Sequence, residues 1–318
     1  MKILFVGFKY LHHSYFGGYD WISNYPGADY FDITKIPFIG SRFMCKRGGR
    51  FVPSLGAFIA LLKSRSYDVV HFFYADRCLA INKNLSTAFV ATTHLRSENY
   101  DNKYLTTLKK CSCVITLSSD EAYKLKSIGI NAIFIPHGFN IPSFQQELTA
   151  GFDCTKINIF YAGSNYRDGE TFLSITEYMK SECPNMIFHA VGQNKTWKEK
   201  LKGKSNIIVY EHLSDNEYYT LLCNCDYNFL PLTFATANNA LLEAQSLGVV
   251  SILPKISGIT DYACEKENLF YSGFSDLTAL FQKLNKRTSC SLLKDYSKKF
   301  EWKNIYSELS KLYEGLKK

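Results

Sequence analysis

The sequence predicts an α/β protein with two domains, each a parallel β-sheet covered by helices. Three observations support this prediction. The chain has 318 residues, which is more than a single domain usually holds. Short segments rich in Val, Ile, Phe and Tyr alternate with segments of helical spacing from end to end. A polar stretch near the middle interrupts this alternation once, and it marks the boundary between the domains.

The first predicted domain covers residues 1–145. Its strand candidates are short and apolar, and segments with helical spacing separate them, which is typical of a parallel sheet with both faces covered. The candidates are KILFVGF (2–8), ADYFDI (28–33), DVVHFFY (68–74), TAFVATT (87–93), CVITLS (113–118) and NAIFIP (131–136).

The second predicted domain covers residues 146–298 and repeats the same alternation. We expect the two domains to be Rossmann-like and to face each other across a cleft, with ligands beyond the carboxyl ends of the strands. The strand candidates are KINIFYAGS (156–164), MIFHAVG (186–192), NIIVYEH (206–212), DYNFLP (226–231) and VVSILP (249–254).

The last segment, residues 299–318, is predicted to be a helix that packs back on the first domain. Its apolar residues follow a helical stripe on one side. These residues are Trp302, Ile305, Leu309, Leu312 and Leu316.

Composition and charge limit the classes of function. Apolar residues make up 46% of the chain and charged residues 21%, as in ordinary folded proteins. The net charge of +8 would suit nucleic acid, anionic lipid or phosphorylated substrates. No single element combines a basic stripe with interleaved aromatic residues, so a nucleic-acid partner is not expected.

The start of the chain and its longest apolar stretch bear on location. A strand-like run follows Met1 directly, without the apolar core of a signal peptide, so a cytoplasmic protein is expected. The apolar stretch Phe51 to Leu62 is too short to span a bilayer. It follows a basic cluster, so the segment Arg42 to Leu62 fits either a helix lying on the inner membrane surface or a solvated loop before a core helix.

The ten cysteines are expected to be reduced thiols rather than a disulfide framework. Two C-x-C pairs occur, Cys111 with Cys113 and Cys223 with Cys225. Alternating strand positions point to the same side, which makes a metal site conceivable. Both pairs lie where a strand is predicted to start, and burial is the favoured interpretation, so no metal ligands are assigned.

Two features at the strand ends of the first domain are candidates for binding. Gly17 and Gly18 follow the first strand, and adjacent glycines let the backbone approach an anion closely, although taken alone the pair is better explained by a tight turn. The dinucleotide spacing fails after Gly7, so NAD is disfavoured. His94 follows the fourth strand, where it could contact a sugar hydroxyl or cap the next helix.

The second domain has a glycine turn after its first strand, at Gly163, followed by Arg167 and a helix expected near Gly169. A planar guanidinium in such a turn can bind two oxygens of a diphosphate, although an exposed loop charge is the simpler alternative. Arg167 is therefore a candidate both for donor binding and for catalysis, since it could stabilise the leaving-group charge.

The stretch TFATANNALLEAQSLG predicts a helix that starts near Thr236, with the Thr236 hydroxyl as its N-cap. Amide groups at Ala237, Asn238 and Asn239 would hold a diphosphate at the positive end of the helix dipole. Glu243, one turn further along, could accept both hydroxyls of a ribose. The alternative is a capped helix with a solvated glutamate.

NNALLEAQSLGVVSILP resembles the C-terminal signature of family 4 glycosyltransferases of the GT-B class. Weaker matches are the glycine pair, VATTH, IPHGFN and HAVGQN, so the resemblance covers nearly the whole chain. It departs from the signature at Ala235, where the family has its first glutamate. Arg167 also stands one position from the usual lysine.

The resemblance implies roles for the candidate residues. Glu243 corresponds to the glutamate that binds the donor ribose, and Asn238 and Asn239 fall where the family contacts the diphosphate and sugar. His94 corresponds to the histidine near the transferred sugar. Gly17 and Gly18 match the loop that covers the donor phosphate.

The implied reaction moves a sugar from a nucleotide-diphosphate sugar to an acceptor, with retention of configuration and without a bound metal or other cofactor. The first domain would bind a glycan or lipid-linked acceptor in surface polysaccharide synthesis. Two other functions stay open: a nucleotide-sugar 2-epimerase of GT-B fold, and a non-catalytic nucleotide-sugar binding protein.

Overall fold

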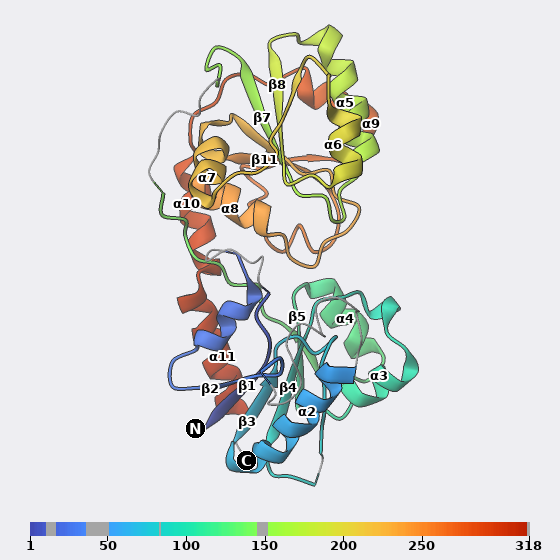
Figure 1. Ribbon diagram of the computed structural model, residues 1–318, viewed down its shortest axis with the longest axis vertical. Helices are drawn as coiled ribbons and strands as arrows, with labels where there is room; N and C mark the ends of the chain where they lie inside the picture. The colour runs from blue at the N-terminus through green and yellow to red at the C-terminus, as the bar shows by residue number, and fades with distance from the viewer. Residues whose placement is uncertain (11–16, 36–50, 83, 145–151, 317–318) are drawn as a thin grey trace. The chain divides into compact units, whose positions relative to one another are not determined.

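The computed structural model describes residues 1–10, 17–35, 51–82, 84–144 and 152–316 (Figure 1). The chain divides into two compact units. Unit 1 comprises Met1–Asn140 and Phe300–Lys318, and unit 2 comprises Ile141–Lys299. Within the described residues each unit contains one six-stranded parallel sheet, so the predicted α/β fold class is confirmed.

The sheet of unit 1 has the strand order β2-β1-β3-β4-β5-β6, and all neighbours are parallel. Each predicted strand of this half is present. Alternate residues of these strands, such as Val70, Phe72 and Val114, form a buried core with the helices. The strands are β1 (Ile3–Gly7), β2 (Asp29–Asp32), β3 (Val69–Phe72), β4 (Ala88–Thr93), β5 (Cys113–Thr116) and β6 (Ala132–Phe134).

The helices of unit 1 include one from the far end of the chain. Helix α11 buries Trp302, Ile305, Leu309 and Tyr313 against unit 1. The predicted stripe was wrong in its last two positions, because Tyr313 takes the buried place and Leu312 is half-exposed. The helices are η1 (Tyr19–Asn24), α2 (Phe51–Lys63), η2 (Ser64–Ser66), η3 (Ser97–Asn99), α3 (Asn102–Leu108), α4 (Ser119–Ser127) and α11 (Trp302–Gly315).

The sheet of unit 2 has the order β12-β11-β10-β7-β8-β9, again with parallel neighbours. Counted from β7, this is the strand order of the Rossmann fold. The five predicted strands are present, and the three-residue edge strand β12 is an addition that the sequence patterns missed. The strands are β7 (Ile157–Ala162), β8 (Met186–Val191), β9 (Ile207–Val209), β10 (Tyr227–Phe229), β11 (Val250–Pro254) and β12 (Leu269–Tyr271).

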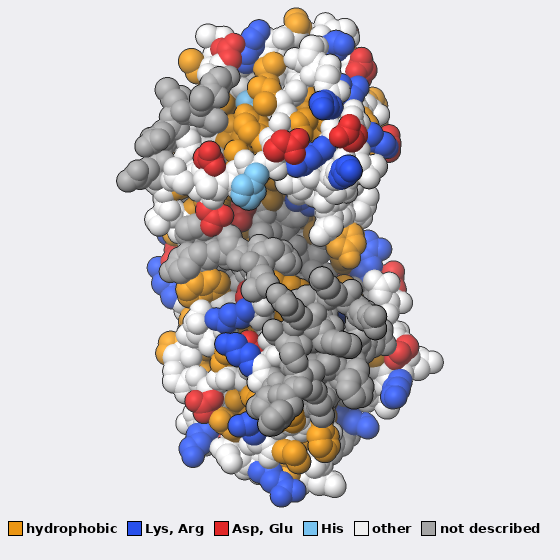
Figure 2. Space-filling model, in the orientation of Figure 1, with side chains coloured by type: hydrophobic (Ala, Val, Ile, Leu, Met, Phe, Trp, Pro, Cys, Tyr) orange, Lys and Arg blue, Asp and Glu red, His pale blue; other side chains and the backbone are white. Residues whose placement is uncertain are grey.

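The helices of unit 2 cover both faces of this sheet. On the face of unit 2 that carries α5 and α6, Figure 2 shows acidic and basic side chains intermixed. Lys200 pairs there with Glu170 at 3.0 Å and Lys204 with Glu177 at 3.4 Å. This face therefore has no basic stripe. The helices are α5 (Gly169–Glu182), α6 (Lys195–Leu201), α7 (Asp215–Asn224), α8 (Asn239–Leu247), α9 (Phe274–Phe281), α10 (Ser291–Ser297) and η4 (Lys298–Phe300), which ends in unit 1.

In both sheets an aspartate side chain links the amino ends of two adjacent central strands. In unit 2 the Asp226 carboxylate accepts a hydrogen bond from the backbone N–H of Asn158 at 2.8 Å, and Asp226 donates its own N–H to the Asn158 carbonyl. In unit 1 Asp68 makes the same pair of contacts with Lys2, at 2.7 and 2.9 Å. Each aspartate thus fixes the register of two adjacent parallel strands.

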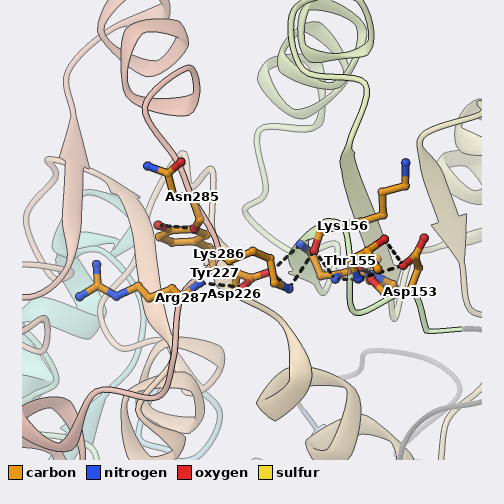
Figure 3. Close-up of polar contacts among 10 residues, drawn as sticks. Asp153, Thr155, Lys156, Asp226, Tyr227, Asn285, Lys286 and Arg287 are labelled. Atoms are coloured by element: carbon orange, nitrogen blue, oxygen red, sulfur yellow. Dashed lines mark hydrogen bonds and ion pairs between the residues drawn. The ribbon is translucent and has the colours of Figure 1, made fainter.

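Asp226 has further partners that its counterpart lacks in the described structure. Its carboxylate accepts from the Nζ of Lys286 at 3.0 Å and from the backbone N–H of Arg287 at 2.9 Å (Figure 3). Lys286 also donates to the carbonyl of Lys156 at 2.8 Å. The Asp226 side chain is buried, so its charge is compensated locally. The contacts tie the segment after α9 to the sheet.

Two sequence-based predictions concern surface segments and thiols. Residues 42–50, the basic part of the proposed membrane segment Arg42 to Leu62, lie outside the described residues. None of the helices in the described part is long and apolar enough to span a bilayer. Cys111, Cys113 and Cys225 are buried free thiols, and burial raises the pKa of each.

Candidate functional site

The topology of unit 2 indicates where a ligand would bind. Strands β7 and β10 are neighbours, with β8 and β9 on one side of the pair and β11 and β12 on the other. In open parallel sheets, ligands bind beyond the carboxyl ends of the strands at such a switch point. The turns that leave β7 and β10 contain Gly163, Arg167 and the start of α8, which are the candidates of this half.

Arg167 lies in the turn between β7 and α5. Its Nε donates to the carbonyl of Ala162 at 2.8 Å and its Nη1 to that of Asn165 at 3.3 Å. Gly163, with φ of +81°, lies against the guanidinium, where a Cβ would be 3.3 Å from Nη2. Among the described residues no carboxylate forms an ion pair with Arg167, and burial lowers its pKa. A half-buried cation of this kind attracts an anionic ligand.

The turn after β7 and the loop after β10 are joined by backbone contacts. Asp168 donates its N–H to the Pro231 carbonyl at 2.7 Å, and Thr233 donates to the Tyr166 carbonyl at 3.0 Å. Arg167 forms an antiparallel bridge with Leu232. The structure therefore brings Arg167 to the loop that leads into α8.

Helix α8 starts later than the sequence predicted. Its first residue is Asn239, and its N-cap is Asn238, whose side-chain oxygen accepts from the Leu241 N–H at 3.1 Å. The prediction of Thr236 as N-cap was wrong, because Thr236 and Ala237 lie in the loop before the helix. An amide oxygen at Asn238 caps as well as a hydroxyl does. The amide groups of the first turn point out of the amino end of α8.

Glu243 is buried, with 7% of its surface exposed, so the alternative of a solvated glutamate is wrong. Tyr218 and Tyr219 of α7 donate their hydroxyls to its two carboxylate oxygens, at 3.0 and 3.3 Å. Burial raises the pKa of Glu243 to about 7, although the tyrosine hydrogen bonds and the charge of Arg167 oppose this rise. Each carboxylate oxygen has a second lone pair, which a ligand hydroxyl could use.

Polar contacts beneath α8 hold the helix in place. Gln245, which is fully buried, accepts from the Cys264 N–H and the Asn268 side chain, and it donates to the Tyr262 carbonyl. Gly258, with φ of +83°, packs so closely on the Ala235 carbonyl that a Cβ would collide with it. The loop after β11 therefore supports both α8 and the loop before it.

Gly17 and Gly18 lie at the start of η1 in unit 1. Both are buried, and Gly18 has an extended backbone with φ of −82° rather than a left-handed one. The helix that follows is a six-residue 3-10 helix, Tyr19–Asn24, instead of an α-helix. The role of the pair toward an anion stays a prediction.

His94 directly follows β4, at the carboxyl edge of the unit 1 sheet. Its Nε2 is 2.8 Å from the Phe73 carbonyl, which can only accept, so Nε2 carries the proton. Its backbone N–H donates to the carboxylate of Asp76 at 2.7 Å. The imidazole lies between the rings of Tyr19 and Tyr74, with both centroid distances at 4.8 Å. The ring is half-buried and firmly oriented.

Sequence reasoning missed the tyrosines that surround these candidates. Tyr218 and Tyr219 contact Glu243 from another helix, and Tyr19 of η1 and Tyr74, which follows β3, contact His94. No local spacing connects such pairs, which are 20 residues or more apart. The position of Tyr74 after a predicted strand was the one available signal.

The comparisons with known proteins identify the fold. No protein-family model and no curated protein sequence matches the chain. HepE of Anabaena, in complex with UDP, aligns over 99% of this chain and 100% of its own, with 14% identity and a TM-score of 0.71. Sucrose-phosphate synthase from Thermosynechococcus elongatus aligns over 99% and 88%, with 15% identity and a TM-score of 0.69.

Within the described residues no cluster of three or more His, Cys, Asp or Glu side chains is arranged to hold a metal ion.

A third similar structure is the lipopolysaccharide outer core galactosyltransferase WaaB, which aligns over 98% of both chains with 13% identity and a TM-score of 0.67. At sequence identities this low, the similarity to the three structures supports the fold alone. The chain therefore has the GT-B fold of these glycosyltransferases, as the sequence resemblance predicted.

Proposed function

We propose that this chain is a glycosyltransferase that transfers a sugar from a UDP-sugar to a glycan or lipid-linked acceptor, with retention, in surface polysaccharide synthesis. The choice of UDP is supported by the similar structures, since HepE was solved with UDP and with UDP-glucose. The observation that carries the proposal is the placement of the buried Glu243 carboxylate one turn into α8, at the switch point that also holds Arg167.

Diphosphate and ribose would follow each other along α8. The phosphates would lie at the amide groups of the first turn, near Asn239, and receive hydrogen bonds from the Arg167 guanidinium. The ribose hydroxyls would donate to the remaining lone pairs of Glu243, each oxygen of which already accepts from one tyrosine. Helix dipole, guanidinium and carboxylate together match the charge pattern of a nucleoside diphosphate.

The same groups would act in the reaction. The bond between the sugar and the diphosphate breaks with negative charge developing on the leaving phosphate, and a preorganised cation and amide dipoles stabilise that charge. Arg167 and the amino end of α8 would supply this stabilisation. His94 would contact the transferred sugar, and Gly17 and Gly18 would let the backbone approach the donor phosphate closely.

Isothermal titration with UDP, GDP and ADP tests the site directly. We expect UDP to bind, and Glu243→Gln and Arg167→Gln each to weaken it about tenfold or more, as the loss of a charged hydrogen-bonding group predicts. Glu170→Gln is the matched control, because Glu170 is an exposed glutamate of the same unit whose ion pair in the described structure is with Lys200. Equal affinity of the Glu243 variant and the control would refute the assignment.

Product analysis with a UDP-sugar then separates the possible functions. Transfer to an added acceptor, or slow release of free sugar, supports the transferase. An isomerised sugar nucleotide formed without acceptor would support the 2-epimerase instead. Binding of UDP-sugars without any turnover would support the non-catalytic binding protein.

Helix α2 supports a membrane-bound acceptor. Its described side chains Phe58 and Leu62 are 54% and 62% exposed, and residues four apart lie on the same helix face. We expect the protein to float with anionic vesicles, whereas the double variant Phe58→Ser, Leu62→Ser should remain in the bottom fraction of the gradient. Tyr123→Ser, which removes an exposed apolar side chain on α4, is the control. If the same amount of protein is recovered in the top fraction with and without vesicles, membrane contact is no longer part of the proposal.

A further inference from the structure

A chain of buried hydrogen bonds runs through unit 1 from helix α11 to η1. The hydroxyl of Tyr313 lies 2.6 Å from Nδ1 of His71, and Nε2 of His71 lies 2.7 Å from the hydroxyl of Thr92. The Thr92 hydroxyl lies in turn 3.1 Å from that of Tyr19. Tyr19 is 2% exposed, and the other three side chains are fully buried.

The imidazole at the centre of this chain is neutral at physiological pH. Burial lowers the pKa of His71 to about 3, so the ring has one N–H and one lone pair at neutral pH. It therefore donates to one hydroxyl neighbour and accepts from the other. Both ring nitrogens have a hydrogen-bond partner, so burial leaves neither of them unpaired. The hydrogen bonds also hold the ring and its partners in fixed positions.

Tyr19 is the end of this chain that contacts His94, a candidate residue of the same unit. It directly follows Gly18, and its ring meets the His94 imidazole edge-on, at 4.8 Å and 84° between planes. Tyr74 flanks the same imidazole from another strand end at 4.8 Å. Tyr19 also contacts Trp302, at 5.7 Å, in the first turn of α11.

We infer that Tyr19 is a positioning residue for His94, with its ring holding the imidazole against Tyr74 and its hydroxyl fixed through Thr92 and His71 by Tyr313 of α11. The last helix of the chain then takes part in setting the orientation of His94. Because Tyr19 adjoins the glycine pair, one side chain fixes two candidate regions of unit 1. The catalytic consequence rests on the proposed transferase function, whereas the orientation of His94 does not.

The test reads the His94 ring without any substrate. In protein labelled with ¹⁵N at histidine, two-bond ¹H–¹⁵N spectra distinguish the tautomers, and His94→Gln identifies the resonance. We expect the wild type to show the Nε2–H tautomer. Tyr19→Leu and the milder Tyr19→Phe and Thr92→Val should shift the His94 resonances and admit the other tautomer.

Tyr25→Phe is the matched control. Its hydroxyl also tethers η1 to α11, through Ser310, and its ring packs on Tyr313 but makes no ring contact with His94 in the described structure. The control should leave the His94 resonances unchanged. If Tyr19→Phe, Tyr19→Leu and Thr92→Val also leave them unchanged while lowering the unfolding temperature, Tyr19 is a packing residue only and the inference is wrong.

Kinetics provide a second readout once a donor has been identified by titration. Tyr19→Phe should lower kcat on the order of tenfold, as expected when a contact group is displaced slightly, while the Kd for UDP stays within about twofold. A change in Kd without a change in kcat would contradict the positioning role. If no sugar nucleotide is turned over, the proposed function fails, and the NMR result still decides the inference.

Discussion

Replacing Glu243 by glutamine should stabilise the protein at alkaline pH and weaken nucleotide binding at the same time. The carboxylate is buried beside two tyrosine hydroxyls, and burial raises its pKa from 4.5 to about 7. Between these values the folded protein binds more protons than the unfolded chain. Its free energy of unfolding therefore falls as the pH rises through this window, and the loss is complete above the folded-state pKa.

The size of the effect follows from this pKa change. A rise from 4.5 to about 7 corresponds to about 3 kcal/mol lost above the folded-state pKa, at 1.36 kcal/mol for each tenfold change in proton affinity. Glutamine keeps the shape and can exchange hydrogen bonds with Tyr218 and Tyr219, but it does not titrate. The stability of the variant relative to wild type should thus grow by about 2.5 kcal/mol between about pH 5 and pH 8.

Urea unfolding at several pH values, followed by far-ultraviolet circular dichroism, measures this difference. Glu170→Gln, which removes an exposed carboxylate of the same unit, should show almost no trend. A stability difference between Glu243→Gln and wild type that is constant with pH would show that Glu243 is ionised without penalty. A stability of the variant relative to wild type that falls with rising pH would refute the reasoning outright.

Three further substitutions test how unit 2 holds its site, each by urea unfolding. Gly258→Ala should cost about 2 kcal/mol or more, because φ of +83° strains a side chain and the Cβ meets the Ala235 carbonyl; an unchanged midpoint would contradict the close packing. Asp226→Asn should cost about 2–3 kcal/mol, since an amide cannot accept from two backbone N–H groups and Lys286 together, and a neutral effect would show that the clamp is dispensable. Asn238→Ala should cost about 1 kcal/mol through the lost N-cap while Asn238→Asp stays near wild type, and equal loss in both would point to a role other than capping.

The strands of this fold were predictable because parallel strands buried on both faces are continuous apolar runs. The eleven predicted strands all appear, whereas β12 was missed. Its three residues, Leu269–Tyr271, are too few for a period to be recognised, and only pairing with β11 makes them a strand. The strands of this protein can thus be recognised from their own sequences, except for the short edge strand β12.

The site was less predictable, for a physical reason. The start of α8 depends on which residue acts as its N-cap. Thr236 and Asn238 are both residue types that cap helices, and they lie two positions apart. The burial of Glu243 depends on tyrosines of α7, which only the tertiary structure brings near. Spacing along the chain identifies the residues at strand ends, but not what surrounds them.

The return of α11 to unit 1 bears on how the chain folds during synthesis. Unit 2 has all its strands once Lys299 has been made, whereas unit 1 still lacks the helix that buries Trp302 and Tyr313. Unit 1, although most of it is translated first, cannot complete its packing until α11 has been made and released. Translation therefore lets the inserted unit complete its strands before the unit that encloses it in the sequence receives its last helix.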